Sequence, residues 1–294
     1  MGLVRAIMIG DVVGDPGLEV LEAKLPGLIR EYGADFVVVN GENAAEGFGM
    51  TEPTLKRILA AGADVISSGN HIWEKREFWP LLEGEPRMLR PANYPVGAPG
   101  RGWAEIKKDR ENAGSPVSWL VINLQGRDLM PVVDCPFRAF DAITGSQGNI
   151  IPGANNPPGS GKPPYAAEVS KFDLSPPRAN HILLVDFHAE STREKESLAF
   201  YLDGRASLVV GTHTHVQTAD ERILPQGTGY ITDLGMTGAA NGIIGMDAQI
   251  CLNRIKTQVA YRMECAKGAA LIQGVIAEID PETGRAVSVK RISR

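Results

Sequence analysis

The alternation of continuous apolar segments with amphipathic segments is the feature that most constrains how this chain can fold. Apolar segments at 4–9, 35–40 and 64–67 are each followed by a polar loop, and then by residues whose apolar members repeat at helical spacing. Uninterrupted apolar strands between helices are typical of parallel strands that are covered on both faces. The pattern therefore predicts an α/β protein whose neighbouring strands are joined by right-handed crossovers.

The helices that follow these strands can be placed from their apolar residues and their caps. The first is expected at 18–29 and the third at 74–82. The second is expected at 51–60, because Thr51 can cap it and Pro53 is tolerated in a first turn. The glycines at positions 10, 14 and 17 lack the close pair that a dinucleotide-binding loop requires, so no such loop is expected.

The same pattern returns after position 180. Buried strands are expected at 181–187, 206–210 and 230–233. Ser191 and Glu194 fit a capping box that begins a helix, so we interpret Glu194 as a cap and not as a catalytic acid. The remaining expected elements are a helix at 248–259 and strands at 269–279 and 286–292.

The middle of the chain has a different character. Prolines and glycines separate short strand candidates at 102–106 and 117–123, which we expect in a second, partly antiparallel sheet. Residues 142–177 are rich in Gly, Pro, Asn and Ser, which favours a long surface loop, with a lid over a site as the alternative. No other linker is visible, so residues 1–294 are expected to form a single domain built on two sheets.

Composition and charge exclude several classes of protein. Of the 294 residues, 43% are hydrophobic, enough for a sizeable core, and the formal net charge of -5 argues against binding of duplex nucleic acid. No apolar run approaches the roughly 18 residues that span a bilayer, and no cleavable leader follows Met1, so we expect a cytoplasmic protein without membrane contact. The three cysteines are far apart, which favours buried thiols over disulfides.

Side chains of metal-ligand type follow the buried strands, at the point where each strand ends. In open α/β sheets, ligands bind outside the carboxyl ends of the strands, so these side chains are expected to meet. Each of these side chains, taken alone, has a simpler explanation as a turn residue, a solvated acid or a buried histidine. One shared site, however, better explains why such residues occur at five strand ends. The set consists of Asp11, Glu42 with Asn43, Asn70 with His71, His188, and His213 with His215. His181 opens a strand and is interpreted as structural.

The number and type of these residues predict the kind of metal centre. The candidate ligands exceed the four that a tetrahedral zinc ion takes. They suit two metal ions about 3.5 to 4 Å apart with a bridging carboxylate, an arrangement that stabilises the attacking and leaving oxygens in phosphoryl transfer. Mixed imidazole, carboxylate and amide ligands favour Fe, Mn or Zn over Mg or Ca alone. The candidate ligands are Asp11, Glu42, Asn70, His188, His213 and His215.

The motifs around these residues resemble a known superfamily, the calcineurin-like metallophosphoesterases, whose five blocks occur in the same order. Two blocks differ, because Val13 stands where a histidine is usual and Glu42 stands where an aspartate is usual. In both of these differences the chain resembles the bacterial YmdB-like branch. It differs from that branch in its expanded 142–177 loop and at Arg193, where a small residue is usual. The motifs that carry the resemblance are Asp11, Gly41-Glu42-Asn43-Ala44-Ala45, Gly69-Asn70-His71, Asp186-Phe187-His188-Ala189-Glu190, Gly211-Thr212-His213-Thr214-His215 and residues 232–238.

The resemblance implies a four-layer α/β/β/α fold, in which two mixed β-sheets lie between helices. It also implies hydrolysis of small phosphodiesters such as 2′,3′-cyclic nucleotides, by a hydroxide between two metal ions that attacks phosphorus. By this resemblance Glu42 bridges the two metals. Asp11 and His215 complete one metal site, and the other site is formed by Asn70, His188 and His213.

Two further residues take roles outside the ligand set. Asn43 is expected to fill the gap left by Val13, either as a ligand or as a hydrogen-bond donor to phosphate. His71 lies next to a ligand and cannot easily share its metal, so it is expected to bind phosphate and to donate a proton to the leaving oxygen.

Two other functions are left open by the sequence. A nucleotide-sensing regulatory module would keep the metal site with little turnover, and the histidine missing at Val13 is compatible with that role. A phosphomonoesterase acting on proteins or sugar phosphates would use the same residues. A homo-oligomer is also left open.

Overall fold

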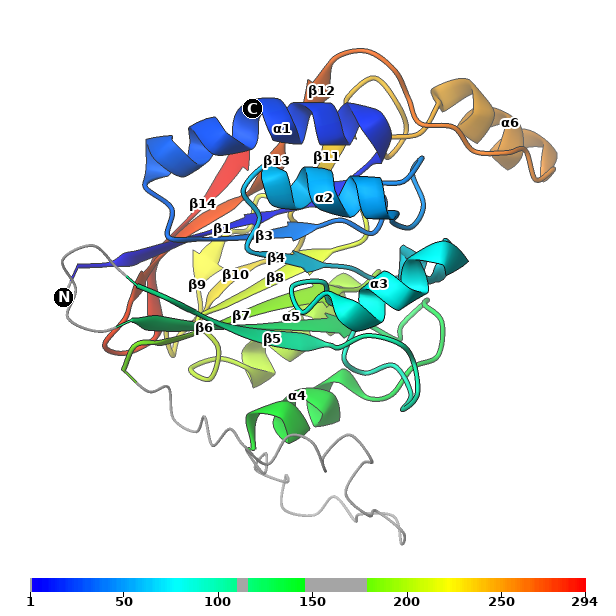
Figure 1. Ribbon diagram of the computed structural model, residues 1–294. Coiled ribbons are helices and arrows are strands. Elements are labelled where there is room, and N and C mark those ends of the chain that lie inside the picture. Colours follow the sequence, from blue (N-terminus) through cyan, green and yellow to red (C-terminus); the bar gives the residue numbers. More distant parts are fainter. Residues whose placement is uncertain (1, 110–115, 146–178) are drawn as a thin grey trace, which may run out of the picture.

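Two β-sheets face each other in the computed structural model, and helices cover their outer faces (Figure 1). The structure describes residues 2–109, 116–145 and 179–294. The expected α/β fold with two mixed sheets between helices is confirmed. Among the described residues, no helix combines the length and apolar character that a membrane crossing requires.

The first sheet has five strands in the order β14-β13-β1-β3-β4. Its parallel part consists of β1 (Val4–Ile9), β3 (Phe36–Asn40) and β4 (Val65–Ser67). The C-terminal strands β13 (Gln273–Asp280) and β14 (Arg285–Ser293) add antiparallel pairs to it. β3 and β4 are buried along their whole length, which explains their uninterrupted apolar character.

The second sheet has six strands in the order β5-β6-β7-β8-β10-β9. Four central strands run parallel, whereas the edge strands β5 and β9 are antiparallel to their neighbours. The expected second, partly antiparallel sheet, to which the strand candidates in the middle of the chain belong, is therefore confirmed. The strands are β5 (Trp103–Lys108), β6 (Val117–Gln125), β7 (His181–His188), β8 (Leu208–Thr212), β9 (Arg222–Ile223) and β10 (Gly229–Ile231).

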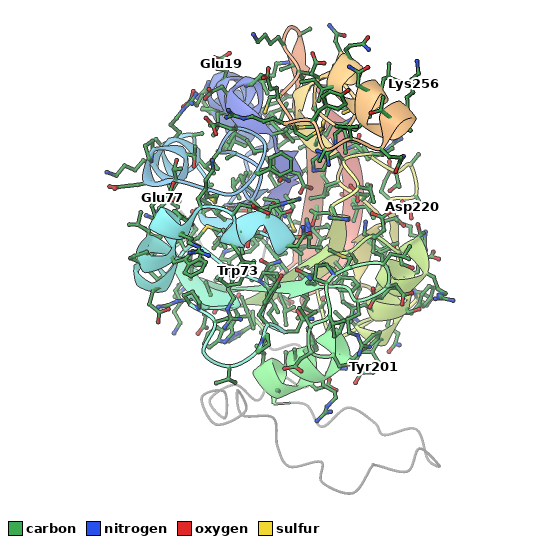
Figure 2. The ribbon with its side chains drawn as sticks, turned by 90° about the vertical axis from the view of Figure 1, so that its right-hand side faces the viewer. Glu19, Trp73, Glu77, Tyr201, Asp220 and Lys256 are labelled. Carbon is green, nitrogen blue, oxygen red and sulfur yellow. The ribbon has the colours of Figure 1, made fainter. Side chains whose placement is uncertain are left out.

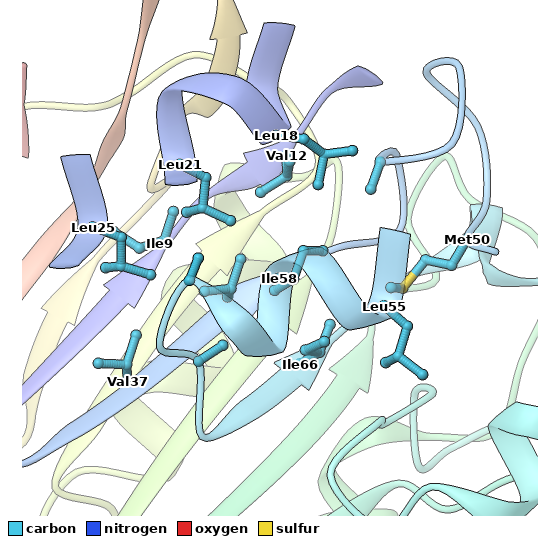
Figure 3. Close-up of a cluster of buried hydrophobic side chains, with 14 of the residues drawn as sticks. Ile9, Val12, Leu18, Leu21, Leu25, Val37, Met50, Leu55, Ile58 and Ile66 are labelled. Atoms are coloured by element: carbon cyan, nitrogen blue, oxygen red, sulfur yellow. The ribbon is translucent and has the colours of Figure 1, made fainter. Parts of the chain in front are cut away.

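Three apolar layers hold these sheets and helices together. On the outer face of the first sheet, leucines of α1 (Gly14–Tyr32) and α2 (Glu52–Ala60) pack on side chains of β1, β3 and β4 (Figure 3). Between the sheets, Phe36 stacks on Trp119 with 4.7 Å between the ring centroids. The outer face of the second sheet is covered by α4 (Pro136–Thr144) and α5 (Thr192–Tyr201). This gives the expected four layers.

A small third sheet was not expected from the sequence. It joins β2 (Asp11–Val12) to β11 (Met236–Ala239) and β12 (Ala270–Leu271). Asp11 therefore lies in a short strand and not in a loop after β1. Next to this sheet, α6 (Ala248–Thr257) projects from the body of the protein on the right-hand side of Figure 1.

Several expected helix boundaries are wrong. In place of one helix at 74–82, the chain forms η1 (Asn70–Trp73), η2 (Arg76–Phe78) and α3 (Trp79–Gly84), because Pro80 can begin a helix but cannot continue one. The first helix begins at Gly14, before the expected position 18. The segment 142–177 begins inside α4, and its residues from 146 onward, together with the proposed lid, lie outside the described residues.

Two expected helix caps are present in different forms. The backbone N–H of Thr51 donates to Thr54 Oγ1 at 2.9 Å, at the start of α2. At the start of α5, the backbone N–H of Glu194 donates to Ser191 Oγ at 3.3 Å, as a capping box requires. The carboxylate of Glu194, however, accepts the backbone N–H groups of Arg127 and Asp128. Glu194 is thus structural, and it ties α5 to the loop after β6.

Candidate metal centre

The strand-end residues meet on one side of the molecule. The parallel strands of both sheets end on the right-hand side of Figure 1, which faces the viewer in Figure 2. Trp73, labelled in Figure 2, closes the short helix η1 that begins with Asn70. His181 lies at the opposite end of β7 from His188, away from this side of the protein.

One group of ligand-type atoms surrounds His188 Nε2, and we call it the His188 cluster. It consists of Glu42, Asn70, His188 and His213. The Nε2 atom lies 2.9 Å from Glu42 Oε1, 3.1 Å from Asn70 Oδ1 and 3.0 Å from His213 Nδ1. Glu42, His188 and His213 each offer one ligand atom, and these atoms all lie within 4.8 Å of one another. Two sheets and three loops thus deliver their ligands to one point.

Hydrogen bonds on the outer side of the two imidazoles determine which nitrogen carries the proton. Thr212 Oγ1 donates to Asp186 Oδ1 at 2.7 Å, so the hydroxyl oxygen is left to accept from His188 Nδ1 at 3.0 Å. The Nε2 atom of His213 lies 3.2 Å from the Glu190 carboxylate, to which its N–H can donate. When both rings are neutral, their inner nitrogens present lone pairs, the form in which histidines bind a metal.

The His188 cluster fits a cation for this reason. Its four converging atoms are two lone-pair nitrogens, one amide oxygen and one carboxylate oxygen. Glu42 is completely buried, and its Oε1 accepts no hydrogen bond among the described residues when Nε2 of His188, 2.9 Å away, carries no proton. A buried carboxylate oxygen without a donor is costly, and a metal ion satisfies all four atoms at once.

Electrostatic shifts in the His188 cluster agree with its buried, charged character. Burial alone would raise the pKa of Glu42, but the neighbouring His188 ring lowers it to about 2. Burial would lower the pKa of His188, but the Glu42 carboxylate raises it to about 9, so His188 carries a second proton that a bound metal ion would displace. Burial and the nearby His188 ring hold the pKa of His213 at about 3, so its imidazole is neutral at physiological pH. Burial raises the pKa of Asp186 to about 6. A neutral His213 and an ionised Glu42 are the forms that coordinate metals.

A second group, the His215 cluster, consists of Asp11, Asn43 and His215. The Nδ1 atom of His215 donates to the carbonyl oxygen of Ile244 at 2.8 Å, which leaves Nε2 with a lone pair. That Nε2 lies 3.7 Å from Asp11 Oδ1 and 3.2 Å from Asn43 Nδ2. Asp11 also links the two clusters, because its Oδ2 accepts the backbone N–H of His213 at 3.3 Å.

The loop that carries both histidines is held in a strained conformation. His213 has a φ of 99° and His215 a φ of 63°, in the left-handed region that side-chain-bearing residues rarely adopt. Thr214, between them, donates its hydroxyl to Asp233 Oδ2 at 2.9 Å, and Lys195 Nζ donates to the same oxygen at 2.7 Å. The Lys195–Asp233 pair is almost completely buried, at 1% exposure for each side chain. This ion pair therefore holds Thr214, and with it the loop, in place.

Gly69 is required by the close approach of His188. A Cβ atom at this position would lie 2.0 Å from His188 Cδ2 and 2.2 Å from Nε2. Any other residue would displace the imidazole from the centre of its cluster. The glycine before Asn70 thus has a packing role, which the motif alone does not reveal.

His71 is the one predicted site residue that joins neither cluster through its ring. Its backbone N–H donates to Glu42 Oε2 at 2.9 Å. Its ring packs edge-on against Phe48, with 5.0 Å between the centroids, and its Nδ1 lies 3.4 Å from Glu74 Oε1. The side chain is 28% exposed and is therefore open to a ligand.

Several residues that position the candidate ligands were given no role by the sequence. Asp186, Glu190 and Thr212 lie within the motifs that carry the family resemblance, and polar residues inside the apolar strands β7 and β8 were a further signal. Lys195 lies in α5 and Asp233 follows β10, so no local pattern shows that they meet.

Sequence comparison places this geometry in a family. A family model described as "YmdB-like protein" matches residues 7–151 and 160–292. The chain belongs to the YmdB-like family. The resemblance inferred from the motifs is thereby confirmed.

Individual relatives of the YmdB-like chain cover nearly its full length. A curated relative from Bacillus subtilis (strain 168), the 2′,3′-cyclic-nucleotide 2′-phosphodiesterase, is 42% identical over 289 residues, which span 98% of this chain and 96% of the relative. A crystal structure of a hypothetical protein from Thermus thermophilus is similar with a TM-score of 0.80 and 38% identity, covering 99% of each chain. A crystal structure of a novel phosphatase from Mycoplasma pneumoniae is similar with a TM-score of 0.83 and 26% identity. The similarity covers 100% of this chain and 94% of the phosphatase chain.

Proposed function

We propose that this chain is a metal-dependent phosphodiesterase that hydrolyses 2′,3′-cyclic nucleotides. The observation that carries the proposal is the convergence of four lone-pair atoms on one point in the His188 cluster. The name of the Bacillus subtilis relative supports this substrate class. The cluster supports the metal, and the exposed His71 beside it supports a role for this residue in catalysis.

We propose two metal ions, of Fe, Mn or Zn type, as the cofactor. Asn70, His188 and His213 would hold one ion, Asp11 and His215 the other, and Glu42 would bridge them. Bound metals of this kind activate water near neutral pH and neutralise charge that develops on phosphate oxygens. Asn43 lies beside Asp11 and His215, where it would serve as a ligand or as a donor to the phosphate.

The protein's own side chains supply orientation and proton transfer in this proposal. Asp186, Thr212, Glu190 and the Ile244 carbonyl orient the imidazoles, so that little reorganisation is needed when ligands bind. The ring of His71 would hydrogen-bond to the phosphate and donate a proton to the leaving ribose oxygen.

Turnover of defined esters tests the proposed function. The purified protein should convert 2′,3′-cyclic AMP to a phosphomonoester and should hydrolyse bis-p-nitrophenyl phosphate, and a chelator should remove both activities. Binding of the cyclic nucleotide without turnover would identify a sensor instead. Faster hydrolysis of monoesters than of diesters would identify a phosphomonoesterase.

Replacement of His213 and of His215 should deplete different metal positions. Because the two rings belong to different clusters, each Ala variant should lower the metal content from about two equivalents per chain to about one. Elemental analysis gives the count, and spectroscopy of the remaining ion gives its ligands. Equal loss of both metals from either variant would contradict the division between the clusters.

His71→Ala should separate metal binding from turnover. The ring packs on Phe48 and lies beside Glu74, which belong to neither cluster, so the metal content should stay near that of the wild type. Loss of a general acid should lower kcat by about 100-fold or more. A substrate with a better leaving group, bis-p-nitrophenyl phosphate, should be affected less than 2′,3′-cyclic AMP. Loss of metal from this variant would make His71 a ligand.

A further inference from the structure

A pocket of about 440 Å³ adjoins the proposed metal centre, on the side from which α6 projects. Its volume is within the range of small-molecule sites. Two of its residues connect it to the centre. His71 bonds to Glu42 through its backbone, and Ala45 follows Glu42 in the same loop. A molecule with its phosphorus at the centre can therefore extend directly into this pocket.

The walls of the pocket combine aromatic and cationic side chains with two carboxylates, Glu46 and Glu74, which lie beside Lys75 and His71. Phe48 and Tyr261 provide aromatic rings, and Met263 adds a polarizable thioether. Arg254 and Arg262 come from α6 and the segment that follows it. Rings of this kind accept a flat heterocycle by stacking.

The two arginines are available to an anion. Lys75, which also lines the pocket, is paired with Glu46 at 3.2 Å. In the part of the chain that the structure describes, neither Arg254 nor Arg262 forms an ion pair with a carboxylate, and Arg254 donates only to the Tyr261 carbonyl. Both guanidinium groups line the same pocket, which brings two such groups within reach of one ligand. Guanidinium groups bind phosphate with two parallel hydrogen bonds.

We propose that this pocket binds the nucleobase of the substrate together with a second phosphate. The proposal rests on the proposed function and adds the substrate class. In a 2′,3′-cyclic nucleotide both the 2′ and 3′ oxygens are esterified, so a second phosphate can be carried only on the 5′ oxygen. The substrate is therefore a 2′,3′-cyclic nucleotide with a 5′-phosphate group, either free or as the link to a preceding nucleotide.

Three substrates distinguish the parts of this proposal. They are 2′,3′-cyclic AMP, its 5′-phosphorylated form, and a dinucleotide that ends in a 2′,3′-cyclic phosphate. The wild type should show the highest kcat/KM for one of the two substrates with a 5′-phosphate group, by about tenfold over 2′,3′-cyclic AMP. A preference for the dinucleotide identifies the ends of RNA chains as the substrate. A preference for the 5′-phosphorylated form identifies free nucleotides as the substrate.

Variants of the pocket test which residues cause the preference. Arg262→Gln should abolish the preference for a 5′-phosphate group, whereas Arg138→Gln, an exposed arginine on α4, should keep it. Because Phe48 also packs on His71, its role is tested in the His71→Ala background. There, Phe48→Leu should weaken the binding of 2′,3′-cyclic AMP in calorimetry by about tenfold, because base stacking is lost. Phe48→Tyr keeps a ring and should restore most of this affinity.

The outcomes separate this proposal from the proposed function. Equal kcat/KM for all three nucleotides in the wild type, with no effect of Arg262→Gln, would overturn the pocket assignment and leave the phosphodiesterase intact. Absence of all diester hydrolysis would overturn the proposed function. In that case calorimetry tests the pocket assignment by itself. Tighter binding of the 5′-phosphorylated nucleotide than of 2′,3′-cyclic AMP, with this difference lost in Arg262→Gln, supports the assignment. Equal binding of the two nucleotides refutes it.

Discussion

Glu42→Gln should lose most of its metal and lower kcat/KM by about a thousandfold or more. The substitution preserves the size of the side chain, but it removes the only carboxylate in the His188 cluster and the proposed bridge between the metals. Metal ions contribute several kcal/mol of transition-state stabilisation in phosphoryl transfer, and a loss of about 4 kcal/mol corresponds to this factor. Elemental analysis and kinetics with 2′,3′-cyclic AMP measure both effects.

Glu52→Gln is the matched control for this experiment. Glu52 is an exposed carboxylate on α2 that is paired with Lys56 at 2.6 Å, and it belongs to neither cluster. This variant should retain its metal and its turnover. Retention of both by Glu42→Gln as well would show that Glu42 is not a ligand.

Lys195→Met should destabilise the protein by about 3–5 kcal/mol and loosen the metal centre. Removal of the ammonium leaves the carboxylate of Asp233 buried with an uncompensated charge, and this is the costly way to break a buried ion pair. The strained loop between His213 and His215 also loses part of its support, because Asp233 is what holds Thr214. Urea unfolding measures the stability, and elemental analysis measures the metal content of the folded variant.

Lys56→Met provides the comparison for an exposed ion pair. The Lys56–Glu52 pair is 71% and 53% exposed, so its loss should change the free energy of unfolding by less than about 1 kcal/mol. Metal affinity should be unaffected in this variant. If Lys195→Met is as stable as Lys56→Met and keeps its metal, the buried pair does not support the loop.

The layers of the fold could be predicted because strands that are buried on both faces are apolar along their length, and this is visible in the sequence. The uninterrupted apolar runs in β3 and β4 are required by helices on one face and a second sheet on the other. The β2–β11 pairing could not be predicted, because a two-residue contact between distant segments has no periodicity in the sequence. Pro80 was a readable signal, and it marks the start of α3 as helix rules require.

The meeting of the candidate residues could be predicted because they lie at strand ends, where topology brings side chains together. Their division between two metal ions follows from the family resemblance and stays a prediction, although Asn70, His188 and His213 lie close together and Asp11 lies near His215. The bridging role of Glu42 and the catalytic role of His71 stay predictions. Lys195 and Asp233 could not be paired from sequence, because their contact depends on how α5 lies over the loop after β10.

The position of β13 beside β1 bears on how this protein is made. β1 leaves the ribosome long before its antiparallel partner β13 has been synthesised. Until then, one edge of the parallel strands has unpaired backbone groups that can bind strands of other chains. We therefore expect the growing chain to depend on chaperones until β13 and β14 are released, and truncation before β13 to cause aggregation.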